Sequence, residues 1–251
     1  MTIAVVSDLH SNEMALRAVL HDIKARGIER VACLGDLVGY GPDPLFAVIT
    51  AMGFEFTIMG NHDEAILYGI PDNFNPIARR ASEWTRKELD PDQHNGLFKR
   101  AELKQKREAW AFLSNLPRSF DLGSDIFFHD TPLDPGSSRY VHALEDAQAA
   151  FAKYSGARRL FIGHSHLPMI FTPGKSLVPK RGKDYKFDSP ALFNVGSVGQ
   201  PRDGDPRASY AIVGEGVTFM RVEYDMQETV RRILANPELD NFLARRLTTG
   251  K

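Results

Sequence analysis

The sequence predicts an α/β fold in which a mostly parallel sheet is joined by a second, mixed sheet. Short apolar runs alternate with helical patterns over residues 1–60, and short strand patterns dominate from residue 169 onward. Strand–helix–strand units of this kind close through right-handed crossovers, which place their strands parallel in one sheet. No linker, internal repeat or low-complexity tract divides the 251 residues, so we expect residues 1–251 to form one domain.

The first sixty residues carry three strand patterns and two helix patterns. The strand patterns are apolar runs at Ile3–Val6, Val31–Leu34 and Phe54–Met59. Apolar residues recur at helical spacing between Met14 and Ile23, and this helix is expected to end near Gly27. A second helix is predicted over Pro44–Met52.

The middle of the chain is predicted to be helical. Residues 63–117 carry the helical period, most clearly over Ile77–Leu89 and Ala101–Leu116. Pro91 and Gly96 interrupt the period between these two stretches, because both residues disfavour a continuous helix.

Shorter elements follow. A hairpin is predicted over residues 118–130, then a helix over Ala143–Tyr154 and a strand over Leu160–Ile162. Residues 173–190 are polar and rich in Lys, Gly and Pro, so we expect a mobile loop there, and the chain from Asp225 onward should be helical. Four further strands are predicted, at Met169–Thr172, Ala191–Asn194, Tyr210–Val213 and Val217–Val222.

The composition argues against several classes of protein. The 31 basic and 32 acidic residues nearly cancel, which disfavours an extended nucleic-acid-binding surface or attachment to an anionic membrane. No run approaches the roughly 20 apolar residues of a membrane span. The first residues lack the layout of a secretion signal, so we expect a cytoplasmic location. Cys33 is the only cysteine, which excludes an intrachain disulfide and a cysteine-based zinc site.

Polar side chains collect directly after the predicted strands. Ligands of open α/β sheets bind outside the carboxyl ends of the strands, so five segments should deliver these side chains to one edge of the fold. The Asp-x-His and His-x-His pairs would each point to one side of an extended backbone, since residues i and i+2 face the same way. Seven candidate ligands result, with nitrogen and oxygen but no sulfur: Asp8, His10, Asp36, Asn61, His129, His164 and His166.

Seven ligands are too many for one tetrahedral ion and suit two ions that share a bridging carboxylate. Imidazole is a good ligand for Zn, Fe, Mn and Ni, whereas carboxylate favours harder ions such as Mg²⁺. The sequence therefore predicts a site for two divalent metal ions.

Five motifs occur in a fixed order: Asp8-Leu9-His10, Gly35-Asp36, Gly60-Asn61-His62-Asp63, His129 and Gly163-His164-Ser165-His166. Their order resembles that of the calcineurin-like metallophosphoesterases over residues 1–170. The stretch Asn194-Val195-Gly196-Ser197 also resembles a turn of the small bacterial, phosphodiesterase-type branch of that family. The resemblance implies an α/β/β/α sandwich of two mixed sheets flanked by helices.

The resemblance also implies a role for each matching residue. It implies three sets of ligands: Asp8, His10 and His166 for one metal ion, Asn61, His129 and His164 for the other, and Asp36 as the bridge. It further implies that His62 is a catalytic residue beside the scissile phosphate and that Asp63 orients it. We expect Mn or Fe in preference to Zn, Ni or Mg.

The function implied is that of a dinuclear metal-dependent phosphohydrolase, in which a metal-bridging hydroxide attacks the phosphorus. The sequence after Asp36 lacks the Asp-Arg-Gly continuation of eukaryotic-type Ser/Thr protein phosphatases. We therefore favour a phosphodiester or a nucleotide-type phosphoanhydride over a phosphomonoester or a phosphoprotein. A non-catalytic scaffold is a further alternative, because the retromer subunit resembles this fold. That branch lacks the histidine of Gly-Asn-His-Asp, which this chain keeps as His62.

Arg202 and Tyr40 are the candidate substrate-binding residues. A guanidinium group can bind phosphate through two parallel hydrogen bonds, and a tyrosine ring can stack on a base. The alternatives are an ion pair of Arg202 with Asp203 or Asp205 and a packing role for Tyr40. The basic residues of segment 173–190 form either a solvated loop or a lid over an anionic substrate. The expected partner is a small anionic phosphoester, with nucleotides among the candidates, and a homo-oligomer is compatible with the sequence.

Overall fold

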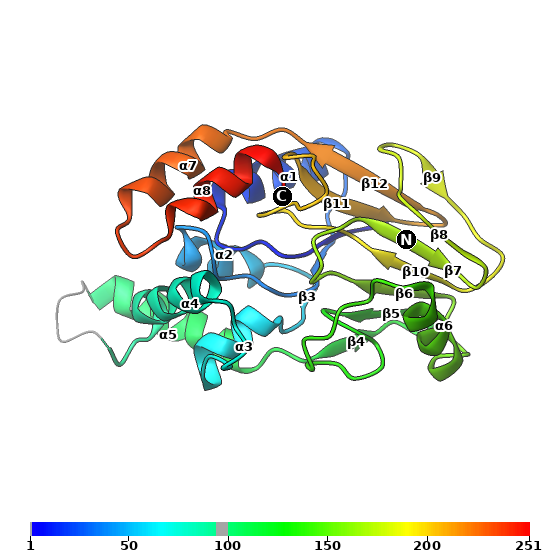
Figure 1. Ribbon diagram of the computed structural model, residues 1–251, viewed down its shortest axis with the longest axis horizontal. Coiled ribbons are helices and arrows are strands. Elements are labelled where there is room, and N and C mark those ends of the chain that lie inside the picture. The colour runs from blue at the N-terminus through cyan, green and yellow to red at the C-terminus, as the bar shows by residue number, and fades with distance from the viewer. Residues whose placement is uncertain (1, 94–99) are drawn as a thin grey trace.

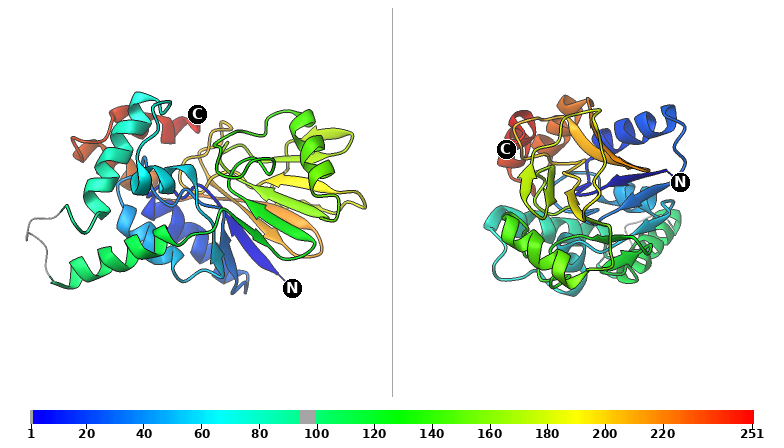
Figure 2. Two further views of the ribbon diagram at one scale, coloured as in Figure 1. Left: turned by 90° about the horizontal axis from the view of Figure 1, so that it is seen from below. Right: turned by 90° about the vertical axis from the view of Figure 1, so that its right-hand side faces the viewer.

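Two six-stranded mixed sheets lie face to face in the computed structural model, which describes residues 2–93 and 100–251. Helices flank the pair of sheets (Figure 1). Two further views show the layers of the molecule from below and from one side (Figure 2). The α/β/β/α sandwich expected from the resemblance is therefore confirmed.

The first sheet has the strand order β3-β2-β1-β11-β12-β9. Strands β1, β2 and β3 are parallel, as the alternating strand and helix patterns predict, and β1 also pairs antiparallel with β11. The N-terminal third of the chain thus shares one sheet with the C-terminal third. The strands are β1 Ile3–Val6, β2 Val31–Cys33, β3 Phe56–Thr57, β9 Asp184–Tyr185, β11 Ala208–Val213 and β12 Val217–Val222.

The second sheet has the order β4-β5-β6-β10-β7-β8. Its central strands β5, β6 and β10 are parallel. Strands β4 and β7 pair antiparallel with β5 and β10, and β8 pairs antiparallel with β7. The expected hairpin over residues 118–130 is confirmed as β4 and β5. The strands are β4 Ser119–Asp121, β5 Asp125–Phe128, β6 Arg159–Ile162, β7 Met169–Thr172, β8 Lys175–Leu177 and β10 Ala191–Asn194.

Eight helices are described: α1 Glu13–Ala25, α2 Pro44–Ala51, α3 Asn61–Tyr68, α4 Pro76–Leu89, α5 Arg100–Ser114, α6 Leu144–Lys153, α7 Met226–Ala235 and α8 Asn241–Thr249. Buried residues of α1, α2 and α5 pack on the first sheet, whereas α6 packs on the second. Helices α4, α7 and α8 form a separate apolar cluster that includes Tyr40. Among the described helices, none combines the length and apolar character needed to cross a bilayer.

The central core lies between the sheets. Phe127, Phe161 and Phe193 come from adjacent parallel strands of the second sheet, and their rings stack 4.9 and 5.3 Å apart between centroids. They pack in one buried cluster with Val5 and Ala211 of the first sheet. Because this cluster joins the two sheets, it fixes the strand ends of one sheet relative to those of the other.

The prediction that residues 63–117 are helical, with an interruption at Pro91 and Gly96, is wrong in part. Helix α3 ends at Tyr68, with Gly69 as its C-terminal cap at φ +123°, and residues 69–75 form a loop before α4. Pro71 and Pro76 are local signals for this interruption, since proline disfavours a helical conformation in the preceding residue. The predicted interruption at Gly96 lies outside the described residues.

The mobile loop expected over residues 173–190 is also wrong in part. Strand β8 continues the second sheet by pairing with β7, and β9 continues the first sheet by pairing with β12. Tyr185 is buried, and its hydroxyl accepts a hydrogen bond from the main-chain N–H of Lys180 at 2.8 Å. Backbone pairing at two sheet edges therefore orders this polar segment.

Candidate metal centre

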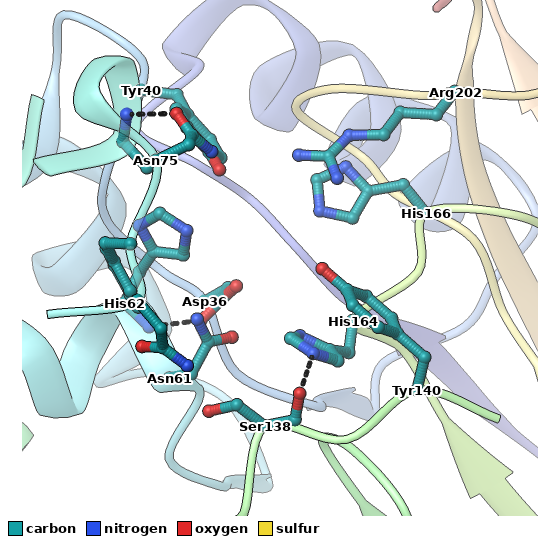
Figure 3. A pocket seen from close by; sticks show the side chains of 13 residues that line it. Asp36, Tyr40, Asn61, His62, Asn75, Ser138, Tyr140, His164, His166 and Arg202 are labelled. Atoms are coloured by element: carbon teal, nitrogen blue, oxygen red, sulfur yellow. Dashed lines mark hydrogen bonds between the residues drawn. The ribbon is translucent and has the colours of Figure 1, made fainter. Parts of the chain in front are cut away.

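The candidate ligands lie where strands of both sheets end. Asp8 follows β1 and Asp36 follows β2, whereas Asn61 opens the helix that comes after β3. His129 follows β5, and His164 lies just after β6 in the second sheet. The parallel strands of each sheet end on the same side, so the two sheets together bring these side chains to one buried site, part of which Figure 3 shows.

Two groups of ligand atoms form at this place, and Asp36 belongs to both. One group is Asp8, His10, Asp36 and His166; the other is Asp36, His129 and His164. Within each group, one ligand atom of every residue lies within 4.8 Å of those of the others, and all of these residues are buried. Asn61 adjoins the second group, with its Oδ1 atom 3.1 Å from Nε2 of His129. All seven predicted ligands are therefore brought together.

Main-chain carbonyl groups fix the protons of the four imidazole rings. A carbonyl oxygen only accepts, so the ring nitrogen bonded to it must carry the hydrogen, and the other ring nitrogen of a neutral imidazole is left as an acceptor. The bonds run from Nδ1 of His10 to Val38, Nδ1 of His129 to Leu34, Nε2 of His164 to Ser138 and Nδ1 of His166 to Gln200, at 2.6 to 3.1 Å. This is the arrangement in which histidines bind metals.

The ring nitrogen atoms of His10 and His166 that do not donate to carbonyl groups lie close together, with no hydrogen atom to form a bond between them. Nε2 of His10 and Nε2 of His166 lie 3.0 Å apart, although both rings use Nδ1 to donate elsewhere. In their neutral forms the two rings would thus direct lone pairs at each other. A cation between them removes this repulsion, so the donor set fits a metal ion.

The electrostatics of the second group lead to the same conclusion. Burial lowers the pKa of His129, but the carboxylate of Asp36, 3.4 Å away, outweighs this effect and raises the pKa to about 10. Burial raises the pKa of Asp36, yet His129 and other histidines hold it well below its usual value. Asp36 and His129 therefore form an ion pair in which a proton supplies the positive charge. A divalent cation would replace that proton, because metal ligands bind in their deprotonated forms.

The carboxyl group of Asp8 has different influences on its pKa from that of Asp36. The pKa of its carboxyl group is raised to about 7, mainly by burial; His129 lowers this pKa, and the negative charge of Asp36 raises it. Both oxygens of Asp8 also accept from the main-chain N–H of His164, at 3.1 and 3.2 Å. Two buried carboxylates close together need positive charge nearby, which is again what a metal ion provides.

The expected extended backbone of the Asp-x-His and His-x-His pairs is wrong, although both pairs converge. Asp8 and His10 have φ values of 53° and 45°, and His164 and His166 have 65° and 61°. Asp36 has φ 53°. The left-handed conformation is uncommon for residues other than glycine, so the side chains are aimed by strained loops.

Close packing with the neighbouring loops supports these conformations. Ser197 Oγ donates to the main-chain oxygen of Asp8 at 2.8 Å, and Asn194 donates from its side chain to the main-chain oxygen of Gly163 at 2.8 Å. A Cβ atom on Gly163 would lie 2.0 Å from Oγ of Ser7, which leaves space only for glycine. The Asn-x-Gly-Ser turn thus connects the ends of β1 and β6 by hydrogen bonds and holds them in place.

Asp63 has other partners than the sequence implies. Its Oδ1 accepts from the main-chain N–H groups of Leu37 and Val38, and its Oδ2 accepts from that of Gly60. The described residues show no hydrogen bond between Asp63 and the ring of His62, whose Nδ1 is buried without a partner. Asp63 therefore fixes the loop after Asp36 against the start of α3, because its oxygen atoms are used by backbone donors.

His62 is held by its surroundings. Its main-chain N–H donates to Oδ1 of Asp36 at 2.8 Å, and its ring lies 4.5 Å from that of Tyr40 and 5.1 Å from that of Phe74. Gly39 has φ +86°, and a Cβ there would lie 2.5 Å from Nδ1 of His62. Burial lowers the pKa of His62 to about 4, so the ring is neutral near pH 7 and carries a single N–H.

A cavity of about 190 Å³ opens onto the ligands. Both predicted substrate-binding residues line it, and the guanidinium group of Arg202 points toward Tyr40 (Figure 3), 5.7 Å from the ring centroid. The alternative ion pairs of Arg202 do not form, since Asp203 pairs with Arg221 and Asp205 with Arg207. Residues 173–190 do not line the cavity. The lid interpretation of that segment is therefore not supported.

Several lining residues were not predicted from the sequence. Asn73, Phe74 and Asn75 belong to the loop between α3 and α4, whose Pro and Asn content is a loop signal. Ser138 and Tyr140 form the opposite wall, where the ring of Tyr140 stacks on His164 at 4.2 Å between centroids. No motif marks these two residues in the sequence, because only the fold places their loop over the ligands.

The model of the family described as "Calcineurin-like phosphoesterase superfamily domain" matches residues 1–215. The chain belongs to this family. Members are phosphoester hydrolases, so the protein is a metallophosphoesterase, and the family implies divalent metal ions at the Asp and His clusters.

Relatives cover the whole chain. An uncharacterized protein of Methanocaldococcus jannaschii is 36% identical over 261 aligned residues, which cover 99% of this metallophosphoesterase and 98% of the relative. A crystal structure of a metallophosphoesterase from Sphaerobacter thermophilus has 32% identity and a TM-score of 0.82, covering 100% of this chain and 99% of that one. A hypothetical protein from Pyrococcus horikoshii shares the fold at 18% identity and a TM-score of 0.75, with 100% and 98% coverage.

Replacement of the shared carboxylate should remove metal from both groups of ligands. For Asp36→Ala we expect loss of both ions, because each group of ligands loses its common member and the cations lose negative charge. Asp36→Asn, which can still accept from the N–H of His62, should also lose metal. Elemental analysis of protein purified without chelators measures this. Asp188→Ala, at an exposed site, is the control. Two tightly retained ions in Asp36→Ala would contradict the shared role.

Proposed function

We propose that this metallophosphoesterase is a dinuclear enzyme that hydrolyses phosphodiesters or nucleotide-type phosphoanhydrides. One observation carries the dinuclear part of the proposal: the carboxylate of Asp36 belongs to two separate groups of ligand atoms, each compact enough for one ion. A carboxylate shared in this way is characteristic of two-metal sites, in which the ions lie roughly 3.5–4 Å apart.

The ligands divide between the two ions around Asp36. We assign Asp8, His10 and His166 to the first ion and Asn61, His129 and His164 to the second. The donors are nitrogen and oxygen alone, since Cys33 is buried in β2 and belongs to neither group, and we favour Mn or Fe as the native metal. When bound, such ions lower the pKa of a water molecule and neutralise phosphoryl oxygens.

The protein's own groups position the substrate around this centre. His62 lines the cavity beside Asp36. We propose that an anionic phosphate bound there raises the pKa of the ring, so that the protonated ring gives its proton to the leaving oxygen of the scissile phosphate. Asp63 acts as a positioning residue, because it fixes the Asp36 loop against α3. Arg202 holds a phosphoryl oxygen by charge-assisted hydrogen bonds, and Tyr40 packs beside the substrate.

An extended substrate suits the cavity better than a bare monoester. The walls of the cavity carry the aromatic rings of Phe74, Tyr140 and Tyr40. Aromatic rings pack against an organic group and not against inorganic phosphate. Arg202 has no acidic partner within ion-pair distance in the described part of the chain, so its charge is available to a substrate. Contacts remote from the scissile bond help to orient it.

The decisive assay compares a diester with a monoester under controlled metal. The metal-free protein, reloaded with Mn²⁺, should hydrolyse bis(p-nitrophenyl) phosphate with a higher kcat/KM than p-nitrophenyl phosphate. Mg²⁺, Zn²⁺, Fe²⁺ and Ni²⁺ are the comparison metals. A folded protein that cleaves neither ester with any of these ions would overturn the proposal, and faster cleavage of the monoester would overturn its substrate class.

His62→Ala should separate catalysis from metal binding. Metal content should stay at the wild-type value, because the ring of His62 is in neither group of ligands. We expect kcat to fall by about 10²–10⁴-fold for diesters with poor leaving groups, which is the usual contribution of a proton donor. The loss should be much smaller for a nitrophenolate leaving group. His21→Ala, an exposed histidine outside the cavity, is the control. Loss of metal, or the same loss for every leaving group, would rule out this role.

Arg202→Ala should affect large substrates more than small ones. We expect kcat/KM to fall at least tenfold further for a dinucleoside polyphosphate than for a p-nitrophenyl ester, since the guanidinium contacts the part of the substrate beyond the scissile bond. Steady-state kinetics on both substrates at fixed free Mn²⁺ measures the difference. Equal effects on both substrates, or none on either, would return Arg202 to a structural role.

A further inference from the structure

A second arginine lies beside Arg202, on a helix far away in the sequence. Arg246 belongs to α8, and its Nη1 donates to Oε1 of Gln200 at 3.3 Å. The same oxygen accepts from Nη2 and Nε of Arg202, at 2.9 and 3.3 Å. One neutral amide oxygen therefore connects two guanidinium groups, and it holds them close together at the edge of the metal-facing cavity.

The charge of this pair is not balanced by acidic side chains. Among the residues that the structure describes, no Asp or Glu lies within ion-pair distance of either guanidinium, because Asp203 and Asp205 pair with Arg221 and Arg207. Arg246 also donates from Nε to an oxygen of the terminal residue Lys251, at 2.7 Å, which offsets part of the charge of Arg246. Burial, and next the charge of Arg202, lower the pKa of Arg246. Two half-buried like charges are costly unless an anion joins them.

The surrounding space can admit such an anion. A second cavity, of about 390 Å³, is lined by Tyr40, Asn75, Pro76, Ile77, Phe242 and Arg246. Tyr40 and Asn75 also line the metal-facing cavity, so the two cavities adjoin. Arg202 lines the first and Arg246 the second, which places the pair where the cavities meet. A ligand held at the metals can therefore extend past both arginines.

We propose that Arg202 and Arg246 together form a binding site for a second phosphoryl group of the substrate. Guanidinium groups bind phosphate through planar pairs of N–H donors, and two of them suit a dianionic group better than one. The favoured substrate then carries a second phosphate next to the scissile one. This inference rests on the proposed function, because it assumes that the scissile phosphate lies at the Asp36 site.

The position of Arg246 on its helix supports a role in binding. Leu243 and Leu247, on either side of it, are buried in the cluster that contains Tyr40, so the helix face is fixed against the cavity wall. Arg245, the preceding residue, is exposed and is not part of this cluster. Arg245 and Arg246 therefore provide a matched pair for mutagenesis, because replacing either one removes the same charge at neighbouring positions.

Competition with two inert ligands tests the site. Methylphosphonate and methylenediphosphonate differ by one phosphonyl group, and neither contains a phosphoester bond. We measure the inhibition constant of each against bis(p-nitrophenyl) phosphate at fixed free Mn²⁺, and we measure direct binding to the same metal-loaded protein by calorimetry. For the wild-type protein, methylenediphosphonate should bind at least tenfold more tightly than methylphosphonate.

Arg246→Gln should weaken the binding of methylenediphosphonate by about 10- to 100-fold, which is the range expected for loss of a charge-assisted hydrogen bond. The binding of methylphosphonate should weaken by less than about threefold. Arg246→Lys should recover part of the loss, and Arg245→Gln should change neither constant. An equal loss of affinity for both ligands, or no loss of affinity for methylenediphosphonate in a folded Arg246→Gln protein, would overturn the proposal.

Failure of this inference can be told apart from failure of the proposed function. If the wild-type protein cleaves the diester but Arg246→Gln binds both phosphonates normally, only the second phosphate site is refuted. If the wild-type protein cleaves no ester with any metal, the proposed function fails, and calorimetry with the two phosphonates still decides whether the arginine pair binds a second phosphoryl group.

Discussion

Four hydrogen bonds between imidazole rings and main-chain carbonyl groups set the chemistry of the site. Each bond places the ring proton on the outer nitrogen, so that the inner nitrogen of a neutral ring is a lone-pair donor. The carbonyl groups belong to loops after strands and to the turn at Gln200, and their positions depend on how the two sheets pack. The ability to bind metal is therefore a property of the backbone as much as of the ligands.

Strain and charge accumulate at the same place. Ligands such as Asp8 and Asp36 adopt left-handed backbone conformations and are fully buried, and each of these features costs stability. The cost is offset by the hydrogen bond from Ser197 and by the hydrogen bonds of Asp63. Local rules of sequence and structure are broken mainly at functional sites, and here the exceptions surround Asp36.

The metal ligands and the residues proposed to bind the rest of the substrate come from different parts of the fold. The ligands come from strand ends joined by the core between the sheets, whereas the outer cavity walls come from the loop before α4, from α8 and from the loop at Tyr140. Tyr40 connects the two parts, because it packs in the cluster of α4, α7 and α8 and also contacts His62. The residues of the outer walls thus belong to other elements than the metal ligands.

The sequence alone predicts most strands and all seven candidate ligands, because apolar runs and polar residues after them are local features. Asp8 and His166 are recognisable before any fold is known. Tertiary structure decides what depends on contacts between distant segments. The pairing of β9 with β12, the backbone partners of Asp63 and the approach of Arg246 to Gln200 leave no local pattern. Backbone hydrogen bonds and packing fix them, and these form only when the chain folds.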